Sequence, residues 1–241
     1  MKTKWIVLTV TMAMVTVAGS AGAGSLDPPG APGPTMKTLD QVEPRTPIDV
    51  VPFTISEPGS YYLTANLTSS GDGVIIETGN VTLDLMGFTL DRDVLGAGTR
   101  GIYIHGSSNA PIRNVIVHNG IIGRNFSTGV RSDYSQDCRF ERLVVAGNFH
   151  GIWIHGGDGG QSNGNTITDC TVSGNESFGV FLYGSNGQSN GNTVIGCTFR
   201  QNIDRGIALS DANSNRTVVH WARTVPPRIP GPTSRGNGLS A

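Results

Sequence analysis

The chain has 241 residues, of which 34 are glycine and 15% are charged, and its formal net charge is −1. Short runs of Asn, Thr, Val and Ile between the glycines favour short strands and tight turns, which excludes a coiled coil and a helical solenoid. The near-neutral charge gives no electrostatic basis for binding nucleic acid or an anionic membrane surface.

The first residues have the pattern of a secretory signal peptide. Lys2 and Lys4 precede an apolar run over residues 5–17, and a small-residue A-x-A motif ends at Ala23. The apolar run is too short to span a bilayer comfortably. We therefore predict a signal peptide over residues 1–23, a secreted or periplasmic mature protein, and no membrane attachment after cleavage. An uncleaved membrane anchor is the alternative.

Proline and glycine are frequent at the start of residues 24–52, which predicts an extended linker. We expect the part after Met36 to act as a leader that caps the end of a repeat domain. The next stretch, FTISEPGSYYLTANL, is predicted to form two short strands about the Pro58-Gly59 turn and to cover the first repeat.

A repeated unit fills most of the remaining chain. GIWIHGGDGGQSNGNTITDCTVSGN, which begins at Gly151, recurs as GVFLYGSNGQSNGNTVIGCTFRQN, which begins at Gly179. Self-similarity at such a period indicates an architecture in which each unit is buried against its neighbours. A glycine followed by alternating residues opens every unit: Gly73, Gly101, Gly129, Gly151, Gly179 and Gly206.

Each unit holds three short strands, which predicts a parallel β-helix of about six coils over residues 53–216, with successive coils about 4.8 Å apart. Leucine-rich repeats are excluded because their leucine spacing is absent, and a left-handed hexapeptide helix is excluded because no six-residue period exists. Asparagines that open the second strand predict an internal ladder at a turn. The predicted ladder contains Asn80, Asn114, Asn165 and Asn192.

The pattern fades after Arg216. From Ala212 onward the sequence has four arginines and no acidic residue. We therefore predict that residues 217–241 form an irregular, disordered tail, produced by a frameshift or truncation, and that the edge of the last coil is open.

The run PGSYYLTANLTSSGDGVIIETGNVTLDLMGFTL, followed by N-x-I/V repeats with GN turns, resembles the secreted bacterial right-handed parallel β-helix proteins. These belong to the broad pectate-lyase-like group, which also holds polysaccharide hydrolases, epimerases and periplasmic copper-processing proteins. The segment MKTLDQVEPRTPI resembles the leader of some of them. The resemblance covers roughly residues 36–216 and implies an all-β, right-handed parallel β-helix. It supplies no catalytic set, because neither the aspartate cluster of pectate lyases nor the motif of pectin hydrolases is found.

The alternation in GIWIHG places Ile152 and Ile154 inside and Trp153 and His155 outside. The same phase in every coil gives two outward rows. One row holds Ile75, Tyr103, Arg131, Trp153, Phe181 and Ala208, and the other holds Glu77, His105, Asp133, His155, Tyr183 and Ser210.

These rows place aromatic rings beside titratable groups on one face. Aromatic rings bind sugars by apolar contact, so the candidate substrate-binding residues are Tyr103, Arg131, Trp153, Phe181 and Tyr183. A carboxylate beside histidines suits acid/base catalysis, so the candidate catalytic residues are His105, Asp133 and His155. We expect no cofactor and no metal ligand. The alternatives are Ca²⁺ bound by Asp84, Asp91 and Asp93, where a solvated loop is the favoured interpretation, and a transition metal bound by His105, Asp133 and His155.

The leading hypothesis is thus an exported protein that binds polysaccharide or a cell-surface glycan, and cleaves it if it is a polysaccharide lyase or glycoside hydrolase. A structural surface module without a ligand and a periplasmic metal-handling protein are the alternatives. Length variation in four segments predicts walls for a shallow groove over the first outward row. These segments are residues 91–100, 106–113, 156–164 and 184–191.

Three further features are less informative. GGDGG at residues 156–160 is similar to calcium-binding glycine-rich repeats but occurs once, so we interpret it as a turn. Cys170 and Cys197 occupy equivalent inward positions, where we favour two buried thiols over a disulfide. His118 and His150 lie near turns and are expected at the surface.

Overall fold

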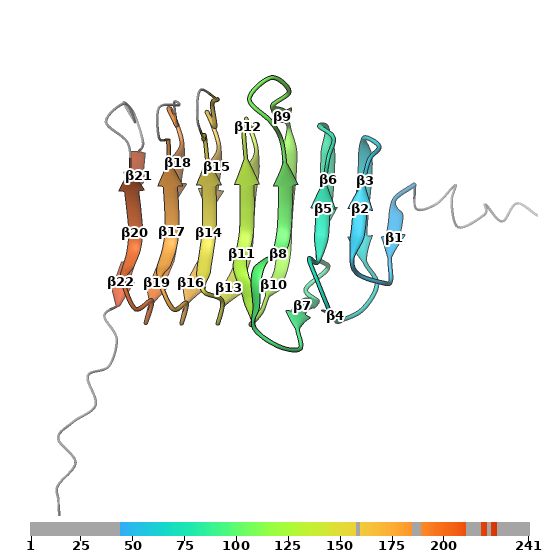
Figure 1. Ribbon diagram of the computed structural model, residues 1–241, viewed down its shortest axis with the longest axis horizontal. Coiled ribbons are helices and arrows are strands. Elements are labelled where there is room, and N and C mark those ends of the chain that lie inside the picture. Colours follow the sequence, from blue (N-terminus) through green and yellow to red (C-terminus); the bar gives the residue numbers. More distant parts are fainter. Residues whose placement is uncertain (1–43, 158–159, 185–188, 211–217, 221–222, 226–241) are drawn as a thin grey trace, which may run out of the picture. The chain divides into compact units, whose positions relative to one another are not determined.

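The computed structural model describes residues 44–157, 160–184, 189–210, 218–220 and 223–225, and every regular element among them is a strand. The predicted signal peptide, most of the predicted linker and residues 226–241 lie outside the described residues. Coils follow one another in chain order from β1 to β22 (Figure 1). The described part of the chain contains no helix with the length and apolarity needed to cross a membrane.

One sheet has seven parallel strands, one from each coil, and runs across the middle of Figure 1. Its strands are β2 (Phe53–Ile55), β5 (Val74–Ile76), β8 (Gly96–His105), β11 (Phe126–Asp133), β14 (His150–His155), β17 (Phe178–Tyr183) and β20 (Arg205–Ser210). Each strand pairs only with its counterparts one coil before and after, so the sheet is built from long-range contacts alone.

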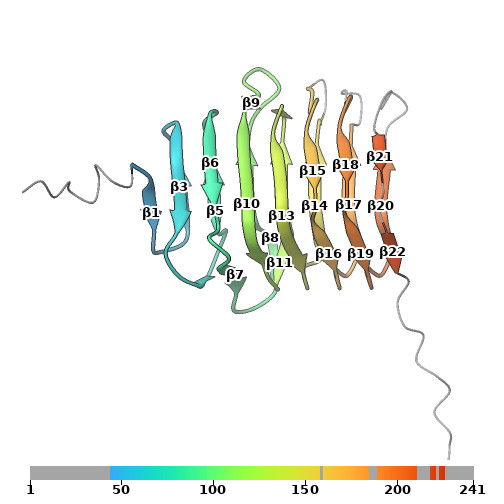
Figure 2. The same cartoon turned by 180° about the vertical axis from the view of Figure 1, so that it is seen from behind.

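The second sheet has 13 strands and is seen from its own side in Figure 2. Its main path contains β1 (Thr46–Ile48), β3 (Gly59–Leu63), β6 (Val81–Asp84), β10 (Val115–Ile122), β13 (Arg139–Ala146), β15 (Thr166–Thr168), β18 (Thr193–Ile195) and β21 (Val218–His220). Off this path lie β4 (Leu67–Ser69), β7 (Thr89–Arg92), β16 (Thr171–Ser173), β19 (Thr198–Arg200) and β22 (Arg223–Val225). A two-stranded sheet pairs β9 (Ile112–Arg113) with β12 (Ser135–Gln136).

The predicted inward residues form the core. Ile152 and Ile154 are completely buried, and Val130 and Val180 lie beside Ile152 in the adjacent coils. Ser132, the predicted exception to the apolar interior, is also buried, and its hydroxyl lacks a hydrogen-bond partner within the described chain. A parallel β-helix with this phase is therefore confirmed.

Glycines line one seam of the stack, where the coils approach too closely for a side chain. A Cβ atom on Gly101 would lie 2.6 Å from the carbonyl oxygen of Gly129. The same atom on Gly151 would lie 2.3 Å from the carbonyl oxygen of Gly179, and on Gly179 it would lie 2.4 Å from that of Gly206. The glycine that opens each repeat is thus required by the contact between coils.

The predicted asparagine ladder is correct for only half of its members. Asn165 and Asn192 are buried, and the Asn165 backbone N–H donates to Asn192 Oδ1 at 2.9 Å. Asn80 and Asn114 are instead exposed, both with φ of 56°, and their amides bond to each other at 3.0 Å. A short amide side chain tolerates this left-handed backbone, so these two asparagines form the turn itself.

A second buried ladder was not predicted. The Asn148 backbone N–H donates to Asn175 Oδ1 at 3.0 Å, and the Asn175 backbone N–H donates to Asn202 Oδ1 at 3.2 Å. Each asparagine therefore satisfies a buried backbone donor of the preceding coil.

The coils extend beyond both predicted limits of the repeat domain. The two strands predicted about the Pro58-Gly59 turn are β2 and β3, with Phe53 beside Val74 of the next coil, and β1, which lies before the predicted start at residue 53, pairs with β3. At the other end, β21 pairs with β18 and β22 with β19, so strand pairing continues past Arg216 into the predicted tail. Backbone pairing between strands needs no asparagine at the turn. The loss of the asparagine after Arg216 therefore did not mark the end of the coils.

All three cysteines are free and buried, in agreement with the interpretation of Cys170 and Cys197 as thiols. These two residues lie at matched positions on adjacent coils, next to the paired residues Thr171 and Thr198. A hydrogen bond with the Cys197 sulfur, together with burial, raises the pKa of the Cys170 thiol. Burial raises the pKa of Cys138 to about 11, so that thiol is neutral at pH 7.

Candidate functional site

The two predicted outward rows exist in the seven-stranded sheet. Arg131 pairs in register with Tyr103 on one side and Trp153 on the other, and Trp153 pairs with Phe181. Asp133 pairs likewise with His105 and His155, and His155 pairs with Tyr183. The parallel ladder therefore brings all eight predicted site residues onto one face, over four adjacent coils.

The first row is a stack in which side chains lie against one another. The Arg131 guanidinium lies 4.2 Å from the centre of the Trp153 ring, and the Trp153 and Phe181 ring centres are 5.3 Å apart. A guanidinium over an indole face is stabilised by the cation–π attraction. Trp153 Nε1 is buried and has no hydrogen-bond partner in the described part of the chain.

The second row continues this stacking across the next pair of positions. The His155 and Tyr183 rings are parallel within 5°, with centres 5.2 Å apart. The Tyr103 and His105 rings stack at 4.8 Å. The rings of Trp153, His155, Phe181 and Tyr183 thus form one group of contacting rings, with Tyr183 6.5 Å from Trp153. Arg131 and Asp133 separate this group from the Tyr103 and His105 pair.

The Asp133 carboxylate connects the two rows. Its Oδ1 accepts a hydrogen bond from Arg131 Nε at 2.6 Å, and its Oδ2 accepts one from the Tyr103 hydroxyl at 3.0 Å. The His155 Nδ1 atom lies 3.5 Å from Oδ1. Asp133 is only 8% exposed, so both oxygens are engaged within the protein. The carboxylate therefore orients Tyr103 and Arg131 and has little capacity left to accept a proton from a ligand.

Burial, followed by the adjacent Asp133 carboxylate, raises the pKa of Tyr103 to about 12. Its phenol therefore keeps its proton, and can donate it in the hydrogen bond to Asp133, up to about pH 12. The Arg100 guanidinium lies 4.4 Å from the centre of the Tyr103 ring. It also lies 3.5 Å from Asp72 Oδ2. The charges of the site are thus arranged as neighbouring pairs of opposite sign.

His105 is separate from the other candidate catalytic residues in its contacts. Its side chain is 52% exposed, and its Nδ1 atom lies 3.6 Å from Glu77 Oε1. Within the described residues, no three His, Cys, Asp or Glu side chains are grouped so that they could hold a metal ion. Asp133 and His155 are thus neighbours, whereas the His105 side chain contacts Tyr103 and Glu77 instead.

The sequence interpretation missed a third group of outward side chains. His150, expected at the surface, is half-buried, with its ring parallel to that of Phe178 at 5.7 Å and 5.0 Å from that of Trp153. Burial, followed by the positive charge of Arg131, lowers the pKa of His150. Both residues stand directly before a repeat glycine, Gly151 and Gly179, and this shared position was the signal that could have identified them.

The glycine-rich loop beyond this face packs on Tyr134. A Cβ atom on Gly160 would lie 2.1 Å from Tyr134 Cδ1, and one on Gly157 would lie 2.4 Å from the Tyr134 hydroxyl. The Tyr134 ring also makes an edge contact with His155 at 6.1 Å. Close approach to Tyr134 explains these two glycines without a calcium ion, and residues 158–159 lie outside the described residues.

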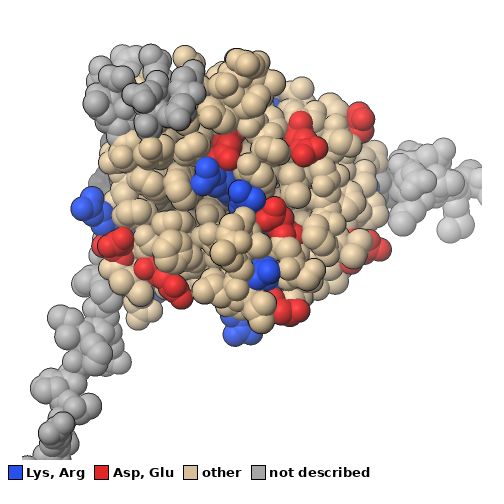
Figure 3. Space-filling model, viewed as in Figure 1, with Lys and Arg blue, Asp and Glu red and all other residues tan. Residues whose placement is uncertain are grey.

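Most of the face shown in Figure 3 is uncharged. Basic and acidic side chains lie next to each other near its middle and at its left and lower edges, and further acidic side chains lie toward the right. The sequence model of the right-handed beta helix region matches residues 63–220. Comparison with curated proteins and with solved structures gives no match.

Proposed function

Because the chain belongs to the right-handed β-helix family, in which stacked coils present a long flat face, we propose that it is an exported protein that binds polysaccharide on its seven-stranded sheet. The ligand lies across the coils, along the row from Tyr103 to Phe181. The observation that carries this proposal is the group of contacting rings on one face of the sheet, with ring centres 5.3 Å apart for Trp153 and Phe181 and 5.2 Å apart for His155 and Tyr183.

Such a row suits a sugar polymer for two physical reasons. The apolar faces of sugar rings gain free energy by covering aromatic carbon, and polar groups beside the rings direct the hydroxyls. Arg131, Tyr183 and His105 supply those polar groups next to the aromatic row. Because charges of both signs lie in pairs, an uncharged polymer suits the face without leaving an unmatched charge.

Binding is favoured over cleavage because of the state of Asp133. A general base or nucleophile needs a carboxylate oxygen that can reach the ligand. Both oxygens of Asp133 are occupied by Arg131, His155 and Tyr103, as described above. Asp133 is therefore assigned the role of holding the binding residues, and a lyase or hydrolase reaction through His105, Asp133 and His155 is the less favoured proposal.

A glycan array with the mature protein tests this function. We expect retention of at least one polysaccharide, and a loss of at least tenfold in affinity on Trp153→Ala, because the stacking surface is removed. Thr171→Ala, on the outer face of β16 in the other sheet, is the matched control and should leave affinity unchanged.

An array without any retained glycan, or equal binding by Trp153→Ala and the unmodified protein, would leave the surface module without a ligand as the better interpretation. Titration with Cu²⁺ and Zn²⁺ tests the metal-handling alternative. That alternative requires binding that His155→Ala abolishes.

A further inference from the structure

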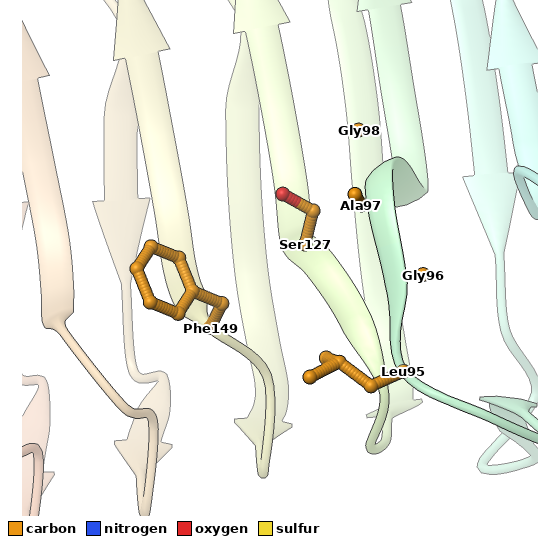
Figure 4. A pocket seen from close by; sticks show the side chains of 6 residues that line it. All are labelled: Leu95, Gly96, Ala97, Gly98, Ser127 and Phe149. Carbon is orange, nitrogen blue, oxygen red and sulfur yellow. The ribbon is translucent and has the colours of Figure 1, made fainter.

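A pocket of about 440 Å³ lies beside the aromatic rows, where strands of the seven-stranded sheet begin. Figure 4 shows the Leu95 side chain and the Phe149 ring at its two ends, with Ser127 and Ala97 between and above them. The lining residues are Leu95, Gly96, Ala97, Gly98, Ser127 and Phe149. None of these side chains is charged, so the pocket is suited to an apolar group.

The wall of the pocket is fixed by hydrogen bonds to other coils. It is formed by residues 95–98, which belong to the long segment 91–100 predicted to border a groove. The Arg92 guanidinium donates to the carbonyl oxygens of Val94 and Ser70, the latter at 2.9 Å. The Asn125 side-chain amide donates to the Arg92 carbonyl oxygen at 2.8 Å. A wall held in this way loses little conformational entropy when a ligand binds.

The apolar residues of the pocket remain open to solvent. Leu95 is 57% exposed and Phe149 is 42% exposed. Covering such side chains removes apolar surface from water, which favours binding of an apolar group. The volume equals that of about fifteen water molecules at ~30 Å³ each, and it lies within the usual range for ligand sites of about 300–1,000 Å³. A chain of several carbons suits this space better than a single methyl or acetyl group.

The pocket is continuous with the proposed binding face through aromatic contacts. The Phe149 and His150 ring centres are 4.5 Å apart, and those of His150 and Trp153 are 5.0 Å apart. One ligand can therefore place a sugar against Trp153 and a substituent of that sugar against Phe149.

We propose that this pocket is a subsite for an acyl group carried by the bound sugar, an inference that rests on the proposed carbohydrate-binding function. Leu95 and Phe149 contact the hydrocarbon chain. The Ser127 hydroxyl, which lies at the wall between them, donates a hydrogen bond to the carbonyl oxygen of the ester or amide linkage. The lining residues carry no cationic side chain to pair with a free carboxylate or phosphate, and the Arg92 guanidinium beside Gly96 already donates to the Val94 and Ser70 carbonyl oxygens.

The test compares methyl 6-O-octanoyl-β-glucoside, below its critical micelle concentration, with methyl β-glucoside by isothermal titration calorimetry on the full mature chain. We expect the octanoyl compound to bind at least tenfold more tightly. Leu95→Asp should remove this difference, because it places a charge at the end of the pocket. Val94→Asp is the matched control, since Val94 is the adjacent residue, is 66% exposed and does not line the pocket, and it should retain the difference.

Equal affinities for the two glucosides, absence of binding by the octanoyl compound, or an unchanged difference in Leu95→Asp would overturn the subsite. If a glycan array shows retained polysaccharide while the octanoyl group adds nothing, only the subsite fails. If the octanoyl compound binds through Leu95 while the array stays empty and Trp153→Ala has no effect, the acyl site stands and the carbohydrate function fails.

Discussion

The outer faces of the two large sheets differ although both are built on the same stacked coils. In the seven-stranded sheet, Arg131, Trp153 and Phe181 stand at paired positions and stack on one another. On the outside of the 13-stranded sheet, Thr171 and Thr198 stand at paired positions. Small β-branched side chains of this kind favour strands and offer few contacts to a ligand. The outer side chains of the 13-stranded sheet thus mainly support the strands, whereas those of the seven-stranded sheet are available for recognition of a ligand.

Inward positions show no such difference between the sheets. Ile152 in the seven-stranded sheet and Phe140 in the 13-stranded sheet are both completely buried, and they belong to one continuous core. A coil can therefore change its outer residues on one face without altering the packing that both faces share.

The largest expected effect follows from this shared core. Phe140→Ala should lower the free energy of unfolding by about 3–5 kcal/mol, because it removes a buried ring and leaves a cavity. The control is Val144→Ala in the same strand, where the side chain is 37% exposed; its effect should stay within about 0.5 kcal/mol. Urea denaturation measures both, and similar losses for the two variants would contradict the assignment of inner and outer positions.

An intermediate effect is expected at the turns between faces. Asn175→Ala removes the acceptor of the buried Asn148 N–H, and an unsatisfied buried donor costs about 1–3 kcal/mol. Asn114→Gly removes the exposed amide contact while keeping a residue that accepts a φ of 56°. We expect this second variant to change unfolding free energy by no more than about 0.5 kcal/mol. A smaller loss of unfolding free energy for Asn175→Ala than for Asn114→Gly would contradict the assignment of Asn175 to the buried ladder and of Asn114 to an exposed turn.

The smallest effect concerns the electrostatics of the recognition face. Asp133→Asn should lower the pKa of Tyr103 from about 12 toward 10.0 without reaching it, because burial is the larger cause of the elevation. NMR titration, with the signal assigned by Tyr103→Phe, measures this pKa. The raised pKa also predicts a stabilising contribution that is complete below pH 10 and is lost as the pH rises toward 12, since the unfolded chain releases the Tyr103 proton first. An unchanged Tyr103 pKa in Asp133→Asn would show that the carboxylate does not act on the phenol.

The sequence predicted the β-helix and both outward rows because the repeat fixes the register. Once Gly151 and Gly179 are aligned, alternation of side chains determines that Trp153 lies beside Phe181, and the structure agrees. A shift of the alternation by one residue would have exchanged the inner and outer residues. Such a shift could be excluded because Ile152 and Ile154 are apolar and therefore belong inside.

Other parts of the site could not be obtained from the repeat. His150 and Phe178 precede the glycines from which alternation was counted, so His150 was expected near a turn and Phe178 was not identified. The apolar pocket depends on how residues 91–100 fold back over Ser127, and segment length alone does not specify that path. The contacts of Asp133 depend on side-chain rotamers, which turn Arg131 toward it within the same strand.

The glycine seam has a consequence for how the molecule can change in length. Since the side chain is absent at Gly151 and again at Gly179, a segment that runs from one such glycine to the next presents the same steric profile at its beginning and at its end. Duplication or deletion of that segment within the gene joins two compatible surfaces and leaves the flanking coils in register. The recognition face can thus lengthen or shorten by whole rungs of about 4.8 Å, and the close similarity of the units that begin at Gly151 and Gly179 is the result expected of one such duplication.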